Sequence, residues 1–177
     1  MTMNRHFIIS FFAMFLMTST GQARIPGSNK NRGNLAIFKL PPFERAVRCI
    51  KFYEGWHTQE SHPYIGYGHC IQPNEKLDHN ITEKQADSLL RSDLLRLCSL
   101  FQSYGKDSLL LGTLAYNIGP YKLLGNSKYP KSTLLRKLEA GNRDIQGDYI
   151  SYCNWDGKYI ASIRRRRILE LKLLYVP

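Results

Sequence analysis

One break in an otherwise helical sequence constrains the fold of this chain more than any other feature. Residues 41–54 carry apolar side chains at helical spacing, and this spacing returns near residue 82. In between, residues 55–80 are rich in Gly, Pro, His and Tyr, and residues 64–69 form the only strand-like run, which predicts a small β lobe or an ordered loop. The sequence therefore predicts an α+β fold that is predominantly helical.

Boundary residues support the predicted helices. Pro42 opens the first helix and Gly55 stops it, so that Glu54 is its last residue. Residues 107–116 are apolar nearly all round, as expected of a helix buried at the centre of a lobe. The predicted helices span residues 41–54, 82–101, 107–116, 132–141 and 160–174.

The N-terminal residues differ from the rest of the chain. Arg5 precedes an apolar run over residues 7–17, which is short for a membrane anchor, and Ala23 offers a small residue for a signal peptidase. We therefore predict a cleaved signal peptide over residues 1–23 and a periplasmic or secreted protein. A flexible lead-in is expected over residues 24–40. An uncleaved N-terminal anchor is the alternative.

Length and charge limit the number of domains and the kinds of partner that the sequence predicts. The chain has 177 residues, 43% of them hydrophobic, which is enough for one domain, placed at residues 41–177. Its formal charge of +11 falls only to +10 without residues 1–23. A basic exported protein concentrates on wall polymers and lipid headgroups, so nucleic acid is not expected as a partner. The alternative is a basic surface with no particular partner.

The cysteines and histidines leave several possibilities open. The four cysteines, Cys49, Cys70, Cys98 and Cys153, allow disulfides in three pairings that the sequence does not rank. Cys49 and Cys98 fit small buried positions equally well. His57 and His62 with Cys70 match no zinc spacing well, so neither a metal nor a cofactor is predicted.

Four consecutive arginines occupy residues 164–167 of the last predicted helix. They could form a nucleic-acid patch, but helical geometry spreads four neighbours around the axis. Some of them must then point inward, and we expect them to bridge this helix to carboxylates of the lobe.

Glu54 is the candidate catalytic acid. It lies at the negative end of a predicted helix dipole, and Phe52, Tyr53 and Trp56 are aromatic neighbours. Both the dipole and burial would raise its pKa, as a general acid for glycoside cleavage requires. The alternative is a solvated glutamate at a helix end.

Fragments along the chain resemble the phage-type lysozymes, glycoside hydrolase family 24. Residues 50–55, Ile-Lys-Phe-Tyr-Glu-Gly, and 64–69, Tyr-Ile-Gly-Tyr-Gly-His, resemble the acid-bearing helix end and the strand that follows it. Residues 114–119, 132–141 and 163–171 resemble later helices of the family in the same order. The resemblance implies a lysozyme-like two-lobed domain that acts as a peptidoglycan muramidase, with no cofactor and expected to be a monomer.

The sequence departs from this family in the segment after the acid. Family members carry an Asp there and a Thr at the start of the strand, whereas residues 56–63 are shorter and contain no Asp. Glu60 is their only carboxylate and is the candidate second catalytic group. Alternatively Thr58, together with His57, His62 or Tyr64, positions the attacking water. Tyr64 occupies the Thr position.

The resemblance also implies sugar contacts and leaves rival functions. Tyr116 and Asn117 at a helix end, and Ser132 and Thr133 at a helix start, are the expected substrate-binding residues. Without the Asp, a lytic transglycosylase using Glu54 alone is one rival, and a wall-binding protein without catalysis is another. An exported muramidase suits wall remodelling, for instance for a secretion or conjugation apparatus.

Overall fold

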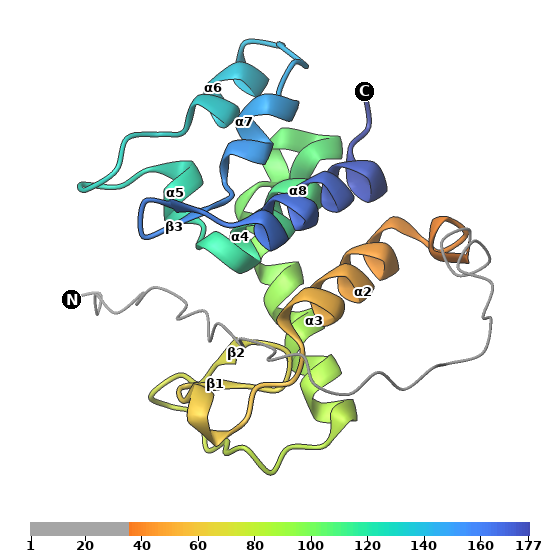
Figure 1. Cartoon of the computed structure of the whole chain (residues 1–177), viewed down its shortest axis with the longest axis vertical. Coiled ribbons are helices and arrows are strands. Elements are labelled where there is room, and N and C mark those ends of the chain that lie inside the picture. The colour runs from red at the N-terminus through yellow and green to blue at the C-terminus, as the bar shows by residue number, and fades with distance from the viewer. Residues whose placement is uncertain (1–35) are drawn as a thin grey trace.

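The computed structural model describes residues 36–177, which form a small lobe and a larger helical lobe joined by a long helix (Figure 1). The helical elements are α2 (Pro42–Glu54), η1 (Gln59–Ser61), α3 (Glu83–Leu100), η2 (Gln102–Asp107), α4 (Ser108–Ile118), α5 (Tyr121–Leu124), α6 (Thr133–Glu139), α7 (Gln146–Ser151) and α8 (Ala161–Leu174). The strands are β1 (Tyr64–Ile65), β2 (His69–Cys70), β3 (Asn154–Trp155) and β4 (Lys158–Tyr159). The predominantly helical α+β fold with two lobes is thus confirmed.

The small lobe is a short antiparallel hairpin packed on the first part of α3. Its register pairs Tyr64 with Cys70 and Ile65 with His69. Gly66 has a φ of 55°, and a Cβ there would lie 2.6 Å from the Cβ of Ala86 on α3. A glycine is therefore needed both for the left-handed turn and for the close approach of hairpin and helix.

α3 carries the chain from the small lobe into the helical lobe. It begins with a capping box in which the Thr82 hydroxyl accepts from the Gln85 backbone N–H and the Gln85 side chain accepts from the Thr82 backbone N–H. Farther along, α3 packs closely on α4, where a Cβ at Gly112 would lie 2.7 Å from the Cys98 sulfur. The central position expected for the apolar segment 107–116 is confirmed, because α4 contacts α2, α3 and α8.

α8 carries the four arginines, and their expected division is confirmed. Arg164 and Arg165 are exposed, whereas Arg166 and Arg167 are buried. Both buried arginines bind the equally buried Glu170, at 2.8 Å from Arg166 Nε to Oε1 and 2.7 Å from Arg167 Nη1 to Oε2. The Tyr149 hydroxyl on α7 donates to the same carboxylate at 2.9 Å. Ionic and polar contacts therefore join α7 and α8 within the apolar core of the helical lobe.

Several features differ from the sequence expectations. Residues 36–38 are helical, because Ile37 packs on the core and Arg45 binds the carbonyls of Phe38 and Leu40, so this part of the lead-in is ordered. The predicted signal peptide and the rest of the lead-in lie outside the described residues. The β3–β4 hairpin and the short helices α5 and α7 were not predicted, since each is too short for a periodic signal.

Two further observations concern disulfide bonds and membrane-spanning helices. The four cysteines, all within residues 36–177, are free thiols, so none of the disulfide pairings permitted by the sequence is formed. Among the described helices, none combines the length and the apolar character needed to cross a bilayer.

The contacts of Glu170 with Arg166, Arg167 and Tyr149, which we call the Glu170 network, predict an effect on stability. Glu170→Ala would leave Arg166 and Arg167 buried without their shared carboxylate, which typically costs about 3–5 kcal/mol in the free energy of unfolding. Urea unfolding measures this. Lys172→Ala, on the exposed side of the same helix, is the control and should change that free energy by less than about 0.5 kcal/mol. A loss below about 1 kcal/mol for Glu170→Ala would contradict the importance of the network.

His69 predicts a pH dependence of stability. Burial opposes its charge, but hydrogen bonds to Asp93 at 2.6 Å and Glu75 at 2.9 Å outweigh this and raise the pKa of His69 above 6.5. Its contribution is therefore complete below pH 6.5 and is lost as the pH rises through the folded-state pKa. The pKa of Glu75 is lowered from 4.5 despite burial, so its contribution is lost in acid.

The stability difference between the native chain and His69→Gln should thus be largest between about pH 5 and 6 and shrink toward pH 9. Thermal or urea unfolding across this range measures it. A difference that grew with rising pH would refute the charged state of His69.

Candidate functional site

Glu54 lies at the end of α2 with its side chain only 8% exposed. Its Oε1 accepts from Arg166 Nη1 on α8 at 2.6 Å, across 112 positions of sequence. Its Oε2 lies 3.9 Å from His57 Nε2. This distance is too long for a hydrogen bond but short enough for electrostatic interaction. The candidate acid is therefore a buried carboxyl between a guanidinium and an imidazole.

The expected rise in the pKa of Glu54 is wrong. Burial favours the neutral acid, as expected, but the nearby Arg166 and His57 outweigh it and lower the pKa of Glu54. The aromatic neighbours contribute less than assumed, because Phe52 is 76% exposed and Trp56 is 44% exposed. Local sequence gave no sign of a guanidinium that arrives from α8.

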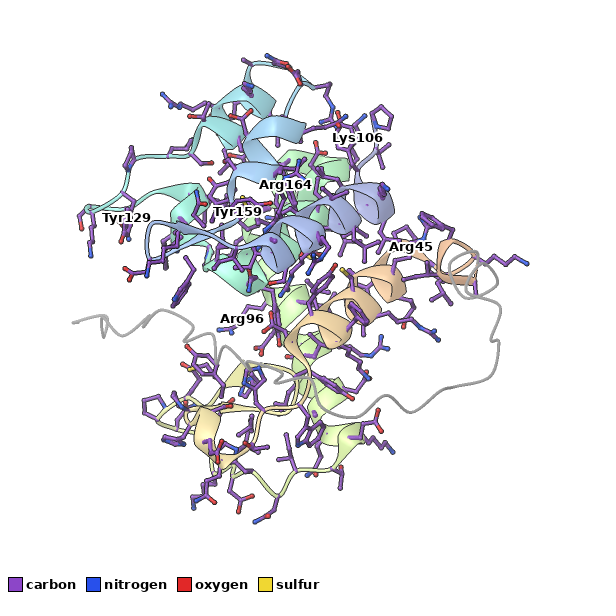
Figure 2. The ribbon with its side chains drawn as sticks, viewed as in Figure 1. Arg45, Arg96, Lys106, Tyr129, Tyr159 and Arg164 are labelled. Carbon is purple, nitrogen blue, oxygen red and sulfur yellow. The ribbon has the colours of Figure 1, made fainter. Side chains whose placement is uncertain are left out.

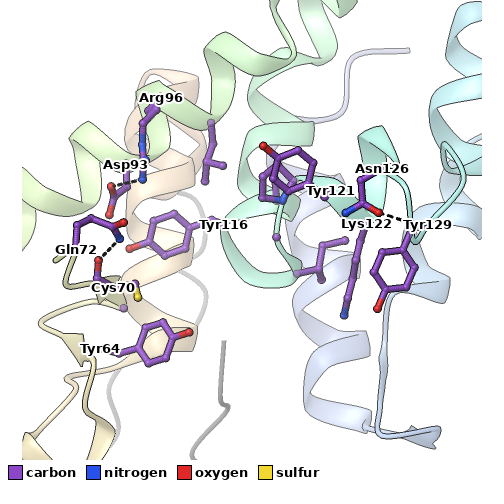
Figure 3. Close-up of a pocket in the computed structure, with 16 residues that line it drawn as sticks. Tyr64, Cys70, Gln72, Asp93, Arg96, Tyr116, Tyr121, Lys122, Asn126 and Tyr129 are labelled. Atoms are coloured by element: carbon purple, nitrogen blue, oxygen red, sulfur yellow. Dashed lines mark hydrogen bonds and ion pairs between the residues drawn. The ribbon is translucent and has the colours of Figure 1, made fainter. Parts of the chain in front are cut away.

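A cavity of about 240 Å³ lies beside this carboxyl. Residues of the hairpin and α3 line one part of it, where Tyr116 of α4 lies beside Gln72 and Cys70, and residues of α5 and the following loop line the opposite part (Figure 3). In Figure 2, Arg96 lies between the lobes, whereas Tyr129 and Tyr159 belong to the helical lobe. We call this cavity the groove. Its lining residues are Tyr64, Gly68, Cys70, Gln72, Asp93, Arg96, Leu97, Ala115, Tyr116, Ile118, Gly119, Pro120, Tyr121, Lys122, Asn126 and Tyr129.

Gly68 connects the groove to the acid. It lines the groove, and a Cβ at this position would lie 3.7 Å from both Cγ and Oε2 of Glu54 and 3.6 Å from the ring of Tyr116. Its φ of 97° also suits glycine. Because Gly68 has no side chain, only its backbone lies between the groove and the carboxyl of Glu54 at this point.

Tyr64 and Tyr116 lie in the groove wall. Tyr64 is 7% exposed, and its ring centroid lies 6.1 Å from that of His57. The Tyr116 hydroxyl donates to the Tyr67 carbonyl at 3.0 Å, which ties α4 to the small lobe. Burial raises the pKa of Tyr116 well above 10, so the phenol keeps its proton. The structure thus brings Tyr116 close to the candidate acid and Tyr64 against His57.

Glu60 and Thr58 lie on the exposed segment between α2 and β1. Thr58 precedes η1, Glu60 is within it, and both are exposed. Within residues 36–177 neither side chain contacts Glu54, whose polar partners are Arg166 and His57. The sequence proposal for these two residues remains a prediction.

All four expected sugar-binding residues have partners inside the fold, Tyr116 through its hydrogen bond to the Tyr67 carbonyl. The buried Asn117 carbonyl oxygen accepts from Arg167 Nη2, and Ser132 caps α6 by accepting from Leu135 N at 3.2 Å. Thr133 is exposed and its hydroxyl accepts from Arg136 at 3.1 Å. Of the four, only Tyr116 lines the groove.

The sequence did not predict the groove residues on and just after α5, nor the direct partner of Glu54. Lys122 and Asn126 line the groove but lie in a segment without helical period or motif. The inward-pointing arginines were predicted as a group, and only the fold identifies Arg166 as the one that reaches Glu54. The helical period of α8 was the one available signal, since it places Arg166 and Glu170 on the same face.

This arrangement can donate a proton to a ligand in the groove. Glu54 is shielded from water, lies beside the glycine in the groove wall, and is held by Arg166 on one oxygen. After proton transfer, the same guanidinium stabilises the carboxylate that remains. Position and shielding thus suit general acid catalysis at a polar bond, which also requires that Glu54 gain a proton before the bond breaks.

Comparison with known proteins identifies the family. Residues 51–170 match the model of the family described as phage lysozyme. An endolysin of Acyrthosiphon pisum secondary endosymbiont phage 1 is 28% identical over 123 residues, which are 63% of this chain and 77% of that protein. The matched range includes Glu54, the β1–β2 hairpin, the groove and the buried arginines of α8. Because this match covers well over half of the chain, the protein belongs to the phage lysozyme family.

Proposed function

We propose that the protein is a muramidase that cleaves the β-1,4 bond between N-acetylmuramic acid and N-acetylglucosamine in peptidoglycan. The observation that carries the proposal is the buried carboxyl of Glu54 beside the groove, held by Arg166. Membership of the phage lysozyme family supports a lysozyme-type hydrolase that lyses peptidoglycan.

In this proposal Glu54 protonates the bridging oxygen between two sugars in the groove. The bond from that oxygen to C1 breaks, its electron pair passes to the oxygen, and positive charge develops at C1. A water molecule then adds to C1. Glu60 is the candidate base for this water, because it is the only carboxylate between residues 55 and 68. Thr58 and Tyr64 are the alternative groups to position it.

The cations that line the groove suit an anionic wall polymer as ligand, although Asp93 also lines it. Lys122 and Arg96 line it, from α5 and α3 respectively (Figure 3). Arg96 binds Asp93 at 3.1 Å, whereas no described residue pairs with the exposed Lys122. Lactyl and peptide carboxylates of peptidoglycan are suitable ligands for such cations.

One observation favours a lytic transglycosylase as second candidate. Within the described residues, no second carboxylate contacts Glu54 or lies between residues 55 and 68 other than the exposed Glu60. A transglycosylase needs only the acid, because the C6 hydroxyl of the muramic sugar replaces water as the nucleophile.

Glu54→Gln tests the proposal. A glutamine keeps the shape and the hydrogen bond from Arg166 but cannot donate the proton. The rate at which purified protein clears a peptidoglycan suspension should fall about 100-fold or more, while sedimentation with insoluble wall persists. Glu139→Gln, at the exposed end of α6, is the control and should clear at the native rate. Clearing that survives in Glu54→Gln would refute the assignment of the acid, and a native chain that binds without clearing would be a wall-binding protein.

Mass spectrometry of the same digest separates the two reactions. A muramidase leaves reducing muramic ends, whereas a transglycosylase leaves anhydro-muramic ends. Anhydro ends as the main product would replace the hydrolase by the second candidate.

The proposed cellular setting is the periplasm or the exterior, reached through a cleaved signal peptide. The expectation rests on the apolar run over residues 7–17 and on Ala23. Protein recovered from the periplasmic fraction should begin near Arg24, as N-terminal sequencing would establish. A full-length chain retained in the membrane fraction would contradict cleavage. Loss of DNA transfer or of envelope assembly after gene deletion would support wall remodelling for a conjugation or secretion apparatus.

A further inference from the structure

His57 occupies an unusual position beside the proposed acid. Both of its ring nitrogens are buried and lack a hydrogen-bond partner within residues 36–177. Its Nε2 lies 3.9 Å from Glu54 Oε2, the carboxyl oxygen that Arg166 does not bind. Burying an imidazole without hydrogen-bond partners costs free energy, so the position of His57 beside the acid calls for an explanation.

The backbone fixes this histidine in place. The His57 N–H donates to the Gly66 carbonyl at 2.8 Å, and the two residues form an isolated antiparallel bridge. The ring also lies against Tyr64, with centroids 6.1 Å apart. The position of the imidazole next to the carboxyl is therefore set by the small lobe rather than by a mobile loop.

The groups packed around the pair limit which of them can exchange a proton with Glu54. They are Arg166 and Glu170 on α8, Tyr116 on α4, Asp93 on α3, Tyr64 on β1, and Cys49 and Tyr53 on α2. Arg166 keeps its proton throughout the physiological range. Burial raises the pKa of Tyr116 well above 10 and that of Cys49 to about 12, so both also keep theirs. Asp93 is already bound to His69.

Glu54 needs such an exchange partner. Arg166 and His57 together overcome the effect of burial and lower its pKa, so the free carboxyl is ionised at neutral pH and lacks the proton that an acid must deliver. Histidine is the side chain that changes charge near neutrality. A small side-chain rotation would bring Nε2 of His57 within hydrogen-bond distance of Oε2 of Glu54, and one bridging water would connect the two atoms without a rotation.

We propose that His57 is the proton-exchanging partner of Glu54, with Nε2 handing a proton to Glu54 Oε2 before cleavage and recovering one afterwards. This inference rests on the proposed glycosidase function. Glu54 passes the proton to the bridging oxygen as the bond to C1 breaks and its electron pair moves to that oxygen. The nucleophile, water or a sugar hydroxyl, forms the new bond to C1 and gives its own proton to the base, Glu60 for water, from which it passes to solvent, while His57 regains a proton from solvent. Protons and electrons balance in either reaction.

The pH dependence of wall clearing tests the exchange. His57→Gln should clear about tenfold or more slowly near pH 7. The fall in rate on the alkaline side should move by up to about two pH units toward acid, since carboxyls ionise lower than imidazoles. His79→Gln is the matched control, because His79 also has two buried ring nitrogens without described partners and packs on His62 rather than near Glu54. Thermal unfolding verifies that both variants are folded.

A His57→Gln profile that keeps the native shape, with or without a uniform loss of rate, would overturn the inference. His57→Asn provides the same test if the glutamine variant does not fold. This failure is distinct from failure of the proposed function, in which the native chain itself would not clear the wall.

A second measurement does not require catalysis. The His57 ring signals, assigned in NMR spectra by their loss in His57→Gln, are titrated in the native chain and in Glu54→Gln. Removing the negative charge at residue 54 should lower the midpoint of the His57 titration. An unchanged midpoint would show that the two groups do not share a proton and would overturn the inference.

Discussion

The buried carboxylate of Glu170 is the interaction on which the rest of the structure depends. It neutralises two guanidiniums inside the helical lobe, and Arg166 carries the same network on to Glu54 at the end of α2. Two arginines and two glutamates thus form an electrically balanced group that is almost wholly removed from water. Removing the Glu170 carboxylate would leave a buried positive charge uncompensated, which costs much more free energy than burying the balanced group.

This network joins the stability of the fold to the geometry of the site. α2 and α8 pack together, and the ion pair between Glu54 and Arg166 lies where the end of α2 meets the small lobe. The same guanidinium that fixes the carboxyl also favours its ionised form. Fixing the acid in this way therefore creates a need for a proton source, and the nearest group with that chemistry is an imidazole of the small lobe.

The sequence predicted the features that depend on local spacing. Helical period placed Glu54 at the end of the first helix, the Thr82 box began α3, and the division of the four arginines followed from the turn of α8. Features that depend on distant partners were missed. The neighbours of Glu54 in sequence predict a raised pKa, whereas the guanidinium that lowers it comes from Arg166, 112 positions away. Asn117 and Ser132 looked like ligand groups, whereas the fold uses one to bind Arg167 and the other to cap α6.

The short segment after Glu54 decides what can face the acid. Gly55 turns the chain at a φ of 66°, and two residues later His57 is already paired with Gly66 of the hairpin. A longer connection could carry a carboxylate away from the helix end and across the groove. Here the chain is bound to the small lobe within three residues of the acid, so the side chain at that point determines the environment of the carboxyl. Because that side chain is histidine, the group fixed beside the acid is of a kind that can gain and lose a proton near neutral pH.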